Sequence, residues 1–494
     1  MRLSTLVKNL QGELLYKGNN WEREVEFLCH DTQTNCKGGL FFFLSGGVCD
    51  GHAYAEQAVK KGAVALVVEK QLNLPVPQFL VEDTRKALSL AAAIYYGSPA
   101  EHLKIIGVTG TNGKTTTAHM LASILRAAGK KVGVIGTLGI EYGKVQKPSA
   151  LTTPDPIALH KAFAEMFLEG VEYVVMEVSA HALYYKKVCG VPFCACIFSN
   201  LSQDHLDFFP NMTAYKNAKT ALFSPQTCAL AIVNGDDETG REIVKMRENI
   251  GAKTACYGLT SPADAFAIVT DAGLGKTECV FNLNDELLRV SLRFTGVHNV
   301  YNALSAAVCA KQLGIDSHDI AQGLHEIKGV NGRLEWVATY DGADIFVDFA
   351  HTPDGLEKTL DALRLHCKGR LICLFGCGGN RDKTKRAPMG ETVAKKSDFA
   401  VLTADNPRYE DPLDIIAEIE KGYRRFSQKY VVVPIRERAI EYALERLQPR
   451  DILLVAGKGG ERYQEIMGIK YAFNDNDIIK KWIEKNRESD GVLR

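Results

Sequence analysis

The 494-residue sequence has no excess of charge of either sign, no Cys-x-x-Cys pair and no long hydrophobic run. Lysine plus arginine and aspartate plus glutamate each number 59, so the formal net charge is zero and lacks the basic surplus typical of nucleic-acid-binding proteins. The thirteen cysteines are odd in number, and several lie inside apolar stretches, which argues against a zinc site or a disulfide framework. We therefore expect a cytoplasmic protein with no nucleic-acid partner.

No apolar stretch approaches the roughly 18 residues of a membrane-spanning helix, and the first ten residues lack the apolar segment of a signal peptide. We expect no membrane insertion. A hydrophobic content of 46% and a charged content of 24% are those of a globular protein. The length predicts about three domains. Glycine-rich breaks at Gly97-Ser98-Pro99 and at 329–332 place their boundaries at 1–97, 98–331 and 332–494.

The last of these segments alternates apolar strands with helical patterns. Strands are predicted at 345–350, 370–376, 399–404, 430–435 and 451–457, which indicates an α/β fold with a doubly wound, Rossmann-like parallel sheet. Polar clusters follow four of the strands: DFAHTPD, GCGGNRDKTKR, ADNPRYEDP and GKGGERY. Since ligands of such sheets bind beyond the carboxyl ends of the strands, these loops predict one shared site. Its Arg381, Arg386 and Arg408 suit an anionic ligand.

The central segment opens with GVTGTNGKTTT at 107–117, between a strand pattern at 103–108 and an amphipathic helix. Glycine-rich turns of this kind bind nucleotide phosphates through backbone N–H groups and a helix N-terminus. Lys114 would reach the terminal phosphates, and the Thr115 hydroxyl would bind magnesium. The general phosphate-loop pattern requires a glycine where Val108 stands, so a strand-to-helix turn without a ligand remains the alternative.

Acidic residues follow two further buried strands of the central segment. Glu177 ends one strand within MEVSAHAL, and Asp204, His205 and Asp207 follow another within SNLSQDHLDFF. Oxygen ligands beside a phosphate loop are typical of magnesium sites, while pairing with bases or helix capping is the alternative. Lys219 alone would be interpreted as a solvated helix lysine.

Taken together, these motifs resemble the Mur ligases. The resemblance rests on GVTGTNGKTTT, MEVSAHAL, SNLSQDHLD, Ala218-Lys219, GVHNVYN, GRLE, DFAHTPD, GCGGNRDKTKR and DNPR, and it runs in order through nearly the whole chain. The family's own phosphate loop departs from the general spacing in the same way. The resemblance implies a UDP-sugar-binding N-terminal domain, a central ATPase domain and a C-terminal amino-acid-binding domain. It also implies ATP-dependent amide formation through an acyl phosphate, in peptidoglycan precursor synthesis, by a protein that we expect to be monomeric.

The resemblance also assigns roles to individual residues. For ATP it implies Gly110, Thr111, Asn112, Gly113, Lys114, Thr115, Thr116, Asn299, Arg333 and Asp348. For magnesium it implies Thr115, Glu177, His205 and Lys219, the last as a carbamylated lysine, and it makes Lys114, Glu177, His205 and Lys219 the catalytic set. For the UDP-sugar peptide it implies Thr32, Thr152, Thr153, Ser179 and Lys187. For the incoming amino acid it implies Arg386, Asp405, Asn406, Pro407, Arg408, Gly457 and Glu461.

The DNPR motif bears on which amino acid is added. In the family this arginine, Arg408 here, accompanies meso-diaminopimelate, whose second carboxylate is attracted by a guanidinium that would repel a lysine ammonium. The motifs also depart from the family pattern: Gly460 replaces a histidine, Gln33 an arginine and Lys187 an arginine. Three alternatives stay open: a lysine-adding ligase, a folylpolyglutamate-type ligase, and a nucleotide-binding protein without ligase activity.

Overall fold

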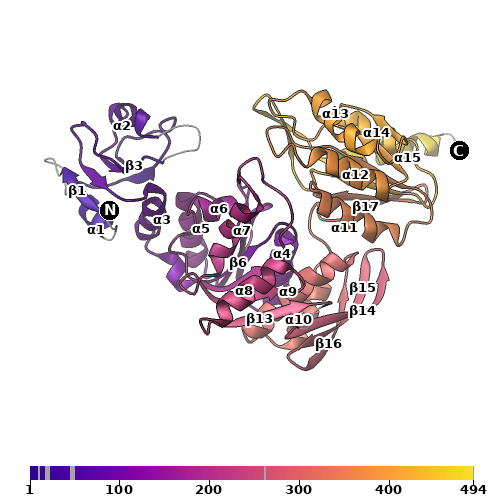
Figure 1. The fold of residues 1–494 in the computed structure, drawn as a ribbon, viewed down its shortest axis with the longest axis horizontal. Helices are drawn as coiled ribbons and strands as arrows, with labels where there is room; N and C mark the ends of the chain where they lie inside the picture. Colours follow the sequence, from indigo (N-terminus) through magenta and orange to yellow (C-terminus); the bar gives the residue numbers. More distant parts are fainter. Residues whose placement is uncertain (9, 11, 17–22, 45–50, 261–262, 493–494) are drawn as a thin grey trace. The chain divides into compact units, whose positions relative to one another are not determined.

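The computed structural model is an α/β structure that describes residues 1–492 except 9, 11, 17–22, 45–50 and 261–262 (Figure 1). The chain divides into two compact units. The first comprises 1–107, 130–196 and 218–230, and the second comprises 108–129, 197–217 and 231–494. In the described part of the chain, no helix combines the length and the apolar character needed to cross a membrane. The twelve cysteines of that part are all free.

The first unit begins with a five-stranded sheet in the order β1-β5-β4-β3-β2. Its strands are β1 (Glu13–Tyr16), β2 (Phe27–Cys29), β3 (Gly39–Phe42), β4 (Ala65–Val68) and β5 (Gln78–Leu80). Only β1 is antiparallel to its neighbour. Successive strand residues point to opposite faces: Phe42 packs with α1 (Leu3–Lys8) and α3 (Thr84–Tyr95), while Phe41 packs with α2 (Ala55–Lys60).

An eleven-stranded sheet has the order β16-β15-β14-β13-β12-β11-β6-β10-β7-β8-β9. Its strands are β6 (Lys104–Thr109), β7 (Val132–Gly136), β8 (Gly139–Tyr142), β9 (Val145–Lys147), β10 (Tyr173–Glu177), β11 (Phe193–Phe198), β12 (Cys228–Asn234), β13 (Thr254–Gly258), β14 (Ala265–Gly273), β15 (Lys276–Leu283) and β16 (Glu286–Leu292). The helices of this region are α4 (Lys114–Ala127), α5 (Pro156–Leu168), α6 (Ala180–Tyr184), α7 (Met212–Thr220), α8 (Glu238–Glu248), α9 (Val297–Gln312) and α10 (Ser317–Glu326), with short 3-10 helices at Gly51–Tyr54, Pro99–His102 and Ala221–Phe223. Helix α4 packs on both α9 and α10.

The C-terminal sheet, orange to yellow in Figure 1, has the order β17-β18-β22-β19-β20-β21. Its strands are β17 (Glu335–Tyr340), β18 (Ala343–Asp348), β19 (Leu371–Phe375), β20 (Phe399–Leu402), β21 (Tyr430–Val432) and β22 (Ile452–Ala456), and all except β17 are parallel. One face packs against α11 (Pro353–Arg364), α12 (Arg386–Lys396) and α13 (Pro412–Tyr423), and the other against α14 (Arg436–Leu444) and α15 (Asp475–Val492). The predicted doubly wound parallel sheet is therefore confirmed.

The predicted apolar strands all form, with ends that differ by up to three residues. The antiparallel strands β14, β15 and β16 were not predicted. In β15 every second residue is buried, from Thr277 to Leu283, and Asn284 and Asp285 at the following turn have φ values of 53° and 66°. Alternation followed by Asn-Asp is a hairpin signal that could have revealed them. The three-domain boundaries at residues 97 and 331 stay a prediction.

Candidate nucleotide and amino-acid site

The glycine-rich loop joins the end of β6 to the start of α4, as predicted. Gly110 has a φ of 143°, and a Cβ there would lie 1.9 Å from Ser199 Oγ. Gly113 has a φ of 90°, and a Cβ there would lie 2.3 Å from Asn302 Oδ1. Only glycine therefore lets the loop pass this close to its neighbours. The predicted strand, glycine-rich turn and helix are therefore present, and the binding of an anion at the N-terminus of α4 stays a prediction.

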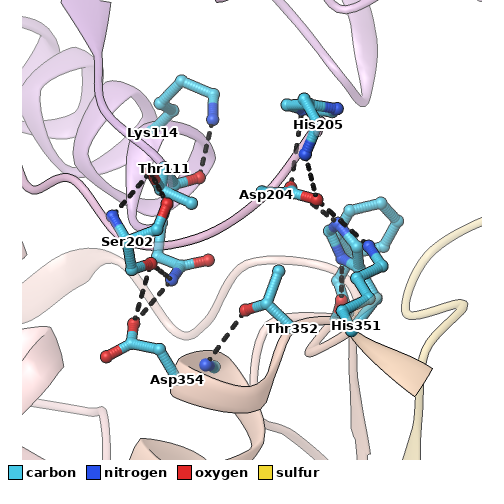
Figure 2. Close-up of polar contacts among 12 residues, drawn as sticks. Thr111, Lys114, Ser202, Asp204, His205, His351, Thr352 and Asp354 are labelled. Carbon is cyan, nitrogen blue, oxygen red and sulfur yellow. Dashed lines mark hydrogen bonds and ion pairs between the residues drawn. The ribbon is translucent and has the colours of Figure 1, made fainter. Parts of the chain in front are cut away.

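The loop is held in place by residues that follow β11. The backbone N–H of Thr111 donates to Asn200 O at 2.8 Å, and that of Asn112 donates to Asn200 Oδ1 at 3.0 Å. Lys114 Nζ donates to the carbonyl oxygens of Gly110 and Thr111, both at 2.9 Å (Figure 2). The ammonium group of Lys114 is therefore held against the loop itself.

Two further predicted ATP residues lie beside the helix. Arg333 Nη2 donates to Thr115 Oγ1 at 2.9 Å, and its guanidinium stacks 4.2 Å from the centroid of the Phe349 ring. Asp348 accepts from the backbone N–H groups of Leu334 at 2.6 Å and Ala350 at 2.8 Å. Arg333 thus contacts α4 through Thr115, and Asp348 fixes the backbone at Leu334, the residue after Arg333.

Asn299, the remaining predicted ATP residue, is buried in α9. Its Nδ2 donates to Thr295 O at 2.9 Å, and its Oδ1 accepts from Asn302 Nδ2 at 3.1 Å. Asn302 in turn faces Gly113 of the loop. The structure thus connects Asn299 to the phosphate loop through Asn302.

A cluster of charges surrounds Asp204, next to the predicted metal ligand His205 (Figure 2). Lys385 Nζ lies 3.1 Å from Asp204 Oδ1, while His205 Nε2 and His351 Nε2 lie 3.4 and 3.6 Å from Asp204 Oδ2. Burial alone would raise the pKa of the Asp204 carboxyl group, but the His351 hydrogen bond and the nearby Lys385 charge lower that pKa well below its usual range. The backbone of His205 has a φ of 58°, a left-handed conformation that is uncommon for residues other than glycine.

A second acidic residue, Asp354 of α11, lies against the loop region. Its Oδ2 accepts from Asn112 Nδ2 at 2.8 Å and from Ser202 Oγ at 3.4 Å (Figure 2). It also accepts from Lys358 Nζ at 2.9 Å. Sequence reasoning singled out neither Asp354 nor Lys385 by itself, although both lie inside quoted motifs, DFAHTPD and GCGGNRDKTKR.

The loops at the carboxyl ends of the C-terminal strands converge as the sequence predicted. Gly379 N donates to Asn406 O at 2.9 Å, and Arg408 Nη1 donates to Gly379 O at 2.8 Å. Lys458 Nζ bonds to Asn406 Oδ1 at 3.0 Å and to Glu461 Oε2 at 2.9 Å. Three of the four polar loops therefore form one cluster, and the Gly457 N–H, which donates to Asp348 O at 3.0 Å, ties the fourth to it.

The arginines of these loops differ in burial and in whether their charge is already paired with a carboxylate of the protein. Arg386 is 1% exposed, and its guanidinium bonds to Glu410 at 3.0 and 3.1 Å and to Glu418 at 3.2 Å. Arg386 is thus neutralised from within the protein. Arg408 is half-buried and Arg381 is exposed. The sequence analysis singled out neither Glu410, which accepts hydrogen bonds from Arg386, nor Lys458, which donates a hydrogen bond to Glu461.

In the first unit, four of the other predicted residues cluster around the end of β10. Glu177 is 1% exposed and accepts from Thr137 N at 2.8 Å, and the Thr137 hydroxyl lies 3.2 Å from that of Thr152. Thr153 Oγ1 donates to Glu177 O at 2.9 Å and accepts from Ser179 N at 3.0 Å. The structure thus brings Glu177, Thr152, Thr153 and Ser179 together.

Three predicted residues of the first unit lie elsewhere. Lys187 pairs with Asp155 at 2.7 Å. Thr32 is half-buried in the loop after β2, where its carbonyl oxygen accepts from Lys61 Nζ at 2.5 Å. Lys219 lies in α7 and is only 1% exposed, so its interpretation as a solvated helix lysine is wrong. Among the described residues, no three His, Cys, Asp or Glu side chains are gathered so as to hold a metal ion.

Known proteins match the chain over nearly its full length. Three family models match in succession: the Mur ligase family catalytic domain at 24–127, the Mur ligase middle domain at 108–310 and the Mur ligase glutamate ligase domain at 332–459. Two relatives are named UDP-N-acetylmuramoyl-L-alanyl-D-glutamate–2,6-diaminopimelate ligase. The one from Geobacillus thermodenitrificans is 38% identical over 99% of this chain and 100% of its own length. The one from Syntrophomonas wolfei is 40% identical over 97% of this chain and 98% of its own length.

Solved structures give the same result. A structure of a ligase with that name is 29% identical, with a TM-score of 0.69 and coverage of 99% of this chain and 100% of the other. MurF from Acinetobacter baumannii shares the fold at 21% identity, with a TM-score of 0.66 and 98% coverage of both chains. The phosphate loop, the three successive domains and these matches define an ATP-dependent, amide-forming ligase. The chain belongs to the Mur ligase family.

Proposed function

We propose that this ligase joins meso-diaminopimelate to UDP-N-acetylmuramoyl-L-alanyl-D-glutamate in an ATP-dependent step of peptidoglycan precursor synthesis. The observation that carries the proposal is Arg408, which lies where the strand-end loops converge, in a chain 38–40% identical to ligases named for this reaction. A guanidinium at this position attracts the distal carboxylate of diaminopimelate. The same group repels the ammonium at the end of a lysine side chain.

The chemistry begins with attack of the acceptor carboxylate on the γ-phosphate of ATP. The N–H groups of the loop and Lys114 stabilise the charge that develops on the phosphate oxygens. Transfer gives an acyl phosphate and ADP; the amine of the amino acid then attacks the acyl carbon, and phosphate leaves with formation of the amide. An acceptor carboxylate labelled with ¹⁸O should therefore pass one labelled oxygen to the released phosphate, and unlabelled phosphate would contradict the acyl phosphate step.

We propose that magnesium is held by Thr115, Glu177, His205 and the carbamate of Lys219. Within the described residues, the buried Glu177 carboxylate accepts hydrogen bonds from Thr137 and pairs with no cationic side chain, and a buried carboxylate requires a positive partner. Thr115 offers a second buried oxygen, and His205 a ring nitrogen. When bound, Mg²⁺ would neutralise the phosphate charge. Removing it with a chelator should abolish phosphate release, and added Mg²⁺ should restore it.

Lys219 fits the proposed carbamate because a buried ammonium is costly. Its neutral amine would attack carbon dioxide and lose a proton, so that an anion replaces the cation. Lys219→Ala should lower kcat by about 100-fold, the loss expected for one group that stabilises transition-state charge. Added acetate should restore part of the activity, because it supplies a carboxylate in place of the missing carbamate. Rescue by methylamine but not by acetate would show that the lysine acts as an amine.

The UDP-sugar peptide is proposed to contact Thr32, Thr152, Thr153, Ser179 and Lys187, and the amino acid to contact Asp405, Asn406, Pro407, Arg408, Gly457 and Glu461. Arg386 is also proposed to contact the amino acid. Because its guanidinium bonds to Glu410 and Glu418, we propose that it also holds the amino-acid-binding loops in position. The free cysteines favour a reducing, cytoplasmic location. A folylpolyglutamate synthase from Mycobacterium tuberculosis shares the fold at 17% identity, which carries no argument for that activity here.

A further inference from the structure

Arg408 has a backbone conformation that an arginine rarely adopts. Its φ is 53°, in the left-handed region, where the Cβ of an ordinary residue crowds the backbone. Such a residue keeps this conformation only when neighbouring groups hold it there, and strain of this kind often occurs at binding sites.

The neighbouring groups come from the hairpin formed by β23 (Tyr463–Ile466) and β24 (Ile469–Ala472). The Arg408 N–H donates to Glu465 O at 3.0 Å, and the Met467 N–H donates to Arg408 O at 2.7 Å. Arg408 therefore continues the edge of the hairpin as a bridge partner of Ile466. Both backbone polar groups of Arg408 are fixed by this one element.

The hairpin also fixes the Arg408 side chain. Glu465 Oε2 lies 3.2 Å from Arg408 Nε, while Gly379 O accepts from Nη1 at 2.8 Å. The side chains of Arg408 and Glu465 are 18% and 21% exposed, so the pair is partly shielded from water. Two anchors on different nitrogens set the plane of the guanidinium, and among the contacts of the described residues none involves Nη2. That edge can therefore donate to a carboxylate.

The same hairpin is joined to the rest of the DNPR motif. Glu465 N donates to Asn406 Oδ1 at 2.9 Å, and Gln464 Nε2 donates to Asp405 O at 2.6 Å. Glu465 thus bonds through its backbone to both Asn406 and Arg408, and through its carboxylate to the guanidinium. A change in the position of Glu465 would therefore move the Arg408 guanidinium as well.

We propose that Glu465 is a positioning residue for Arg408 and that, through Arg408, it sets the selection for an amino acid with a distal carboxylate. The proposal rests on the proposed function of Arg408. Without the Glu465 carboxylate, the guanidinium keeps its charge but loses one of its two anchors, and the ligand must then order it on binding. Recognition of diaminopimelate weakens, while binding of ATP and of the nucleotide peptide is unaffected.

The test is steady-state kinetics of Glu465→Ala and Glu465→Gln, with diaminopimelate, ATP and the nucleotide peptide varied in turn. Glu465→Ala should raise KM for diaminopimelate about tenfold, as expected for the loss of one charge-assisted hydrogen bond, with kcat and the other two KM values within about twofold. Glu465→Gln keeps an oxygen acceptor and should fall between Ala and wild type. Glu437→Gln, an exposed acidic residue of α14, is the control for loss of charge and should match wild type.

A double-mutant cycle separates positioning from general support of the fold. In an Arg408→Ala background, Glu465→Ala should change KM for diaminopimelate by less than about twofold, because its effect passes through Arg408. An independent tenfold effect in that background, or wild-type KM values in both Glu465 variants, would overturn the inference. If the wild-type enzyme shows no preference for diaminopimelate over lysine, the proposed function of Arg408 fails instead, so the two failures are distinguishable. Should Glu465→Ala not fold, the intermediate KM of Glu465→Gln decides the matter.

Discussion

Asp204 and Lys385 form an ion pair in which both side chains are nearly inaccessible, at 5% and 6% exposure. A buried pair of this kind contributes little in itself, but removal of one partner leaves the other charge buried and unpaired. The pair therefore makes the region beside the phosphate loop sensitive to single substitutions.

Lys385→Met should lower the free energy of unfolding by about 3–5 kcal/mol, as expected for one half of a buried ion pair. Urea denaturation at pH 7 measures the change. Lys60→Met, in the exposed pair with Glu56, is the matched control and should cost less than about 0.5 kcal/mol. Adding Asp204→Asn to Lys385→Met should recover part of the loss; equal stability of Lys385→Met and wild type would contradict this account.

Glu410 gives the protein an acid-sensitive contact. The Arg386 hydrogen bond is the main cause that lowers the pKa of Glu410 from 4.5 to about 2. Because the folded-state pKa is depressed, this contact stabilises the protein above about pH 4.5, and the stabilisation is lost as the pH falls toward 2. Glu410→Gln should therefore show a shallower fall in stability between pH 4.5 and 2 than wild type, measured by urea denaturation at a series of pH values. Parallel curves would show that Glu410 is not the titrating group.

At the scale of elements, the path of the phosphate loop requires glycine at position 110. A methyl group at Gly110 would lie 1.9 Å from Ser199 Oγ, which itself donates to Asn112 O at 2.6 Å. Gly110→Ala must therefore displace the serine and strain a backbone with a φ of 143°. The substitution affects both the stability of the loop and its shape.

Gly110→Ala should cost about 3 kcal/mol of stability from crowding and strain together and should abolish ATP binding. Calorimetric titration with ATP, alongside thermal unfolding, measures both. Gly129→Ala at the end of α4 is the control: its φ is also positive, at 71°, but nothing lies within 4 Å of the added Cβ. It should cost about 1 kcal/mol and leave ATP binding intact. ATP binding by Gly110→Ala would refute the assigned role of the loop.

The elements also show what the sequence can and cannot predict. The central C-terminal strands β19 and β22 were predictable because they are buried on both faces and form continuous apolar runs, as in Leu371–Phe375. Strands β14 to β16 have one exposed face, so their signal is a weaker alternation. The convergence of the strand-end loops followed from the parallel topology, but the pairing of Arg386 with Glu410 did not. Which of several arginines is neutralised inside the protein depends on packing that no local pattern encodes.

At the scale of the whole molecule, the predicted residues are divided between the two compact units. The phosphate loop, Arg333 and the amino-acid loops belong to the second unit, and the cluster around Glu177 belongs to the first. A ligase needs both substrates as well as ATP, so phosphate release should require all three components. A nucleotide-binding protein without ligase activity would release phosphate regardless of the amino acid.

The most direct test of the central claim is therefore phosphate release by the full chain with ATP, Mg²⁺ and UDP-N-acetylmuramoyl-L-alanyl-D-glutamate. The assay has three arms: meso-diaminopimelate, L-lysine or no amino acid. We predict rapid release with diaminopimelate and release at least about 100-fold slower in the other two arms, because L-lysine brings an ammonium to the partly buried Arg408 guanidinium and the third arm has no amine to react. Equal release in all three arms would contradict ligase activity, and faster release with lysine would contradict the role assigned to Arg408.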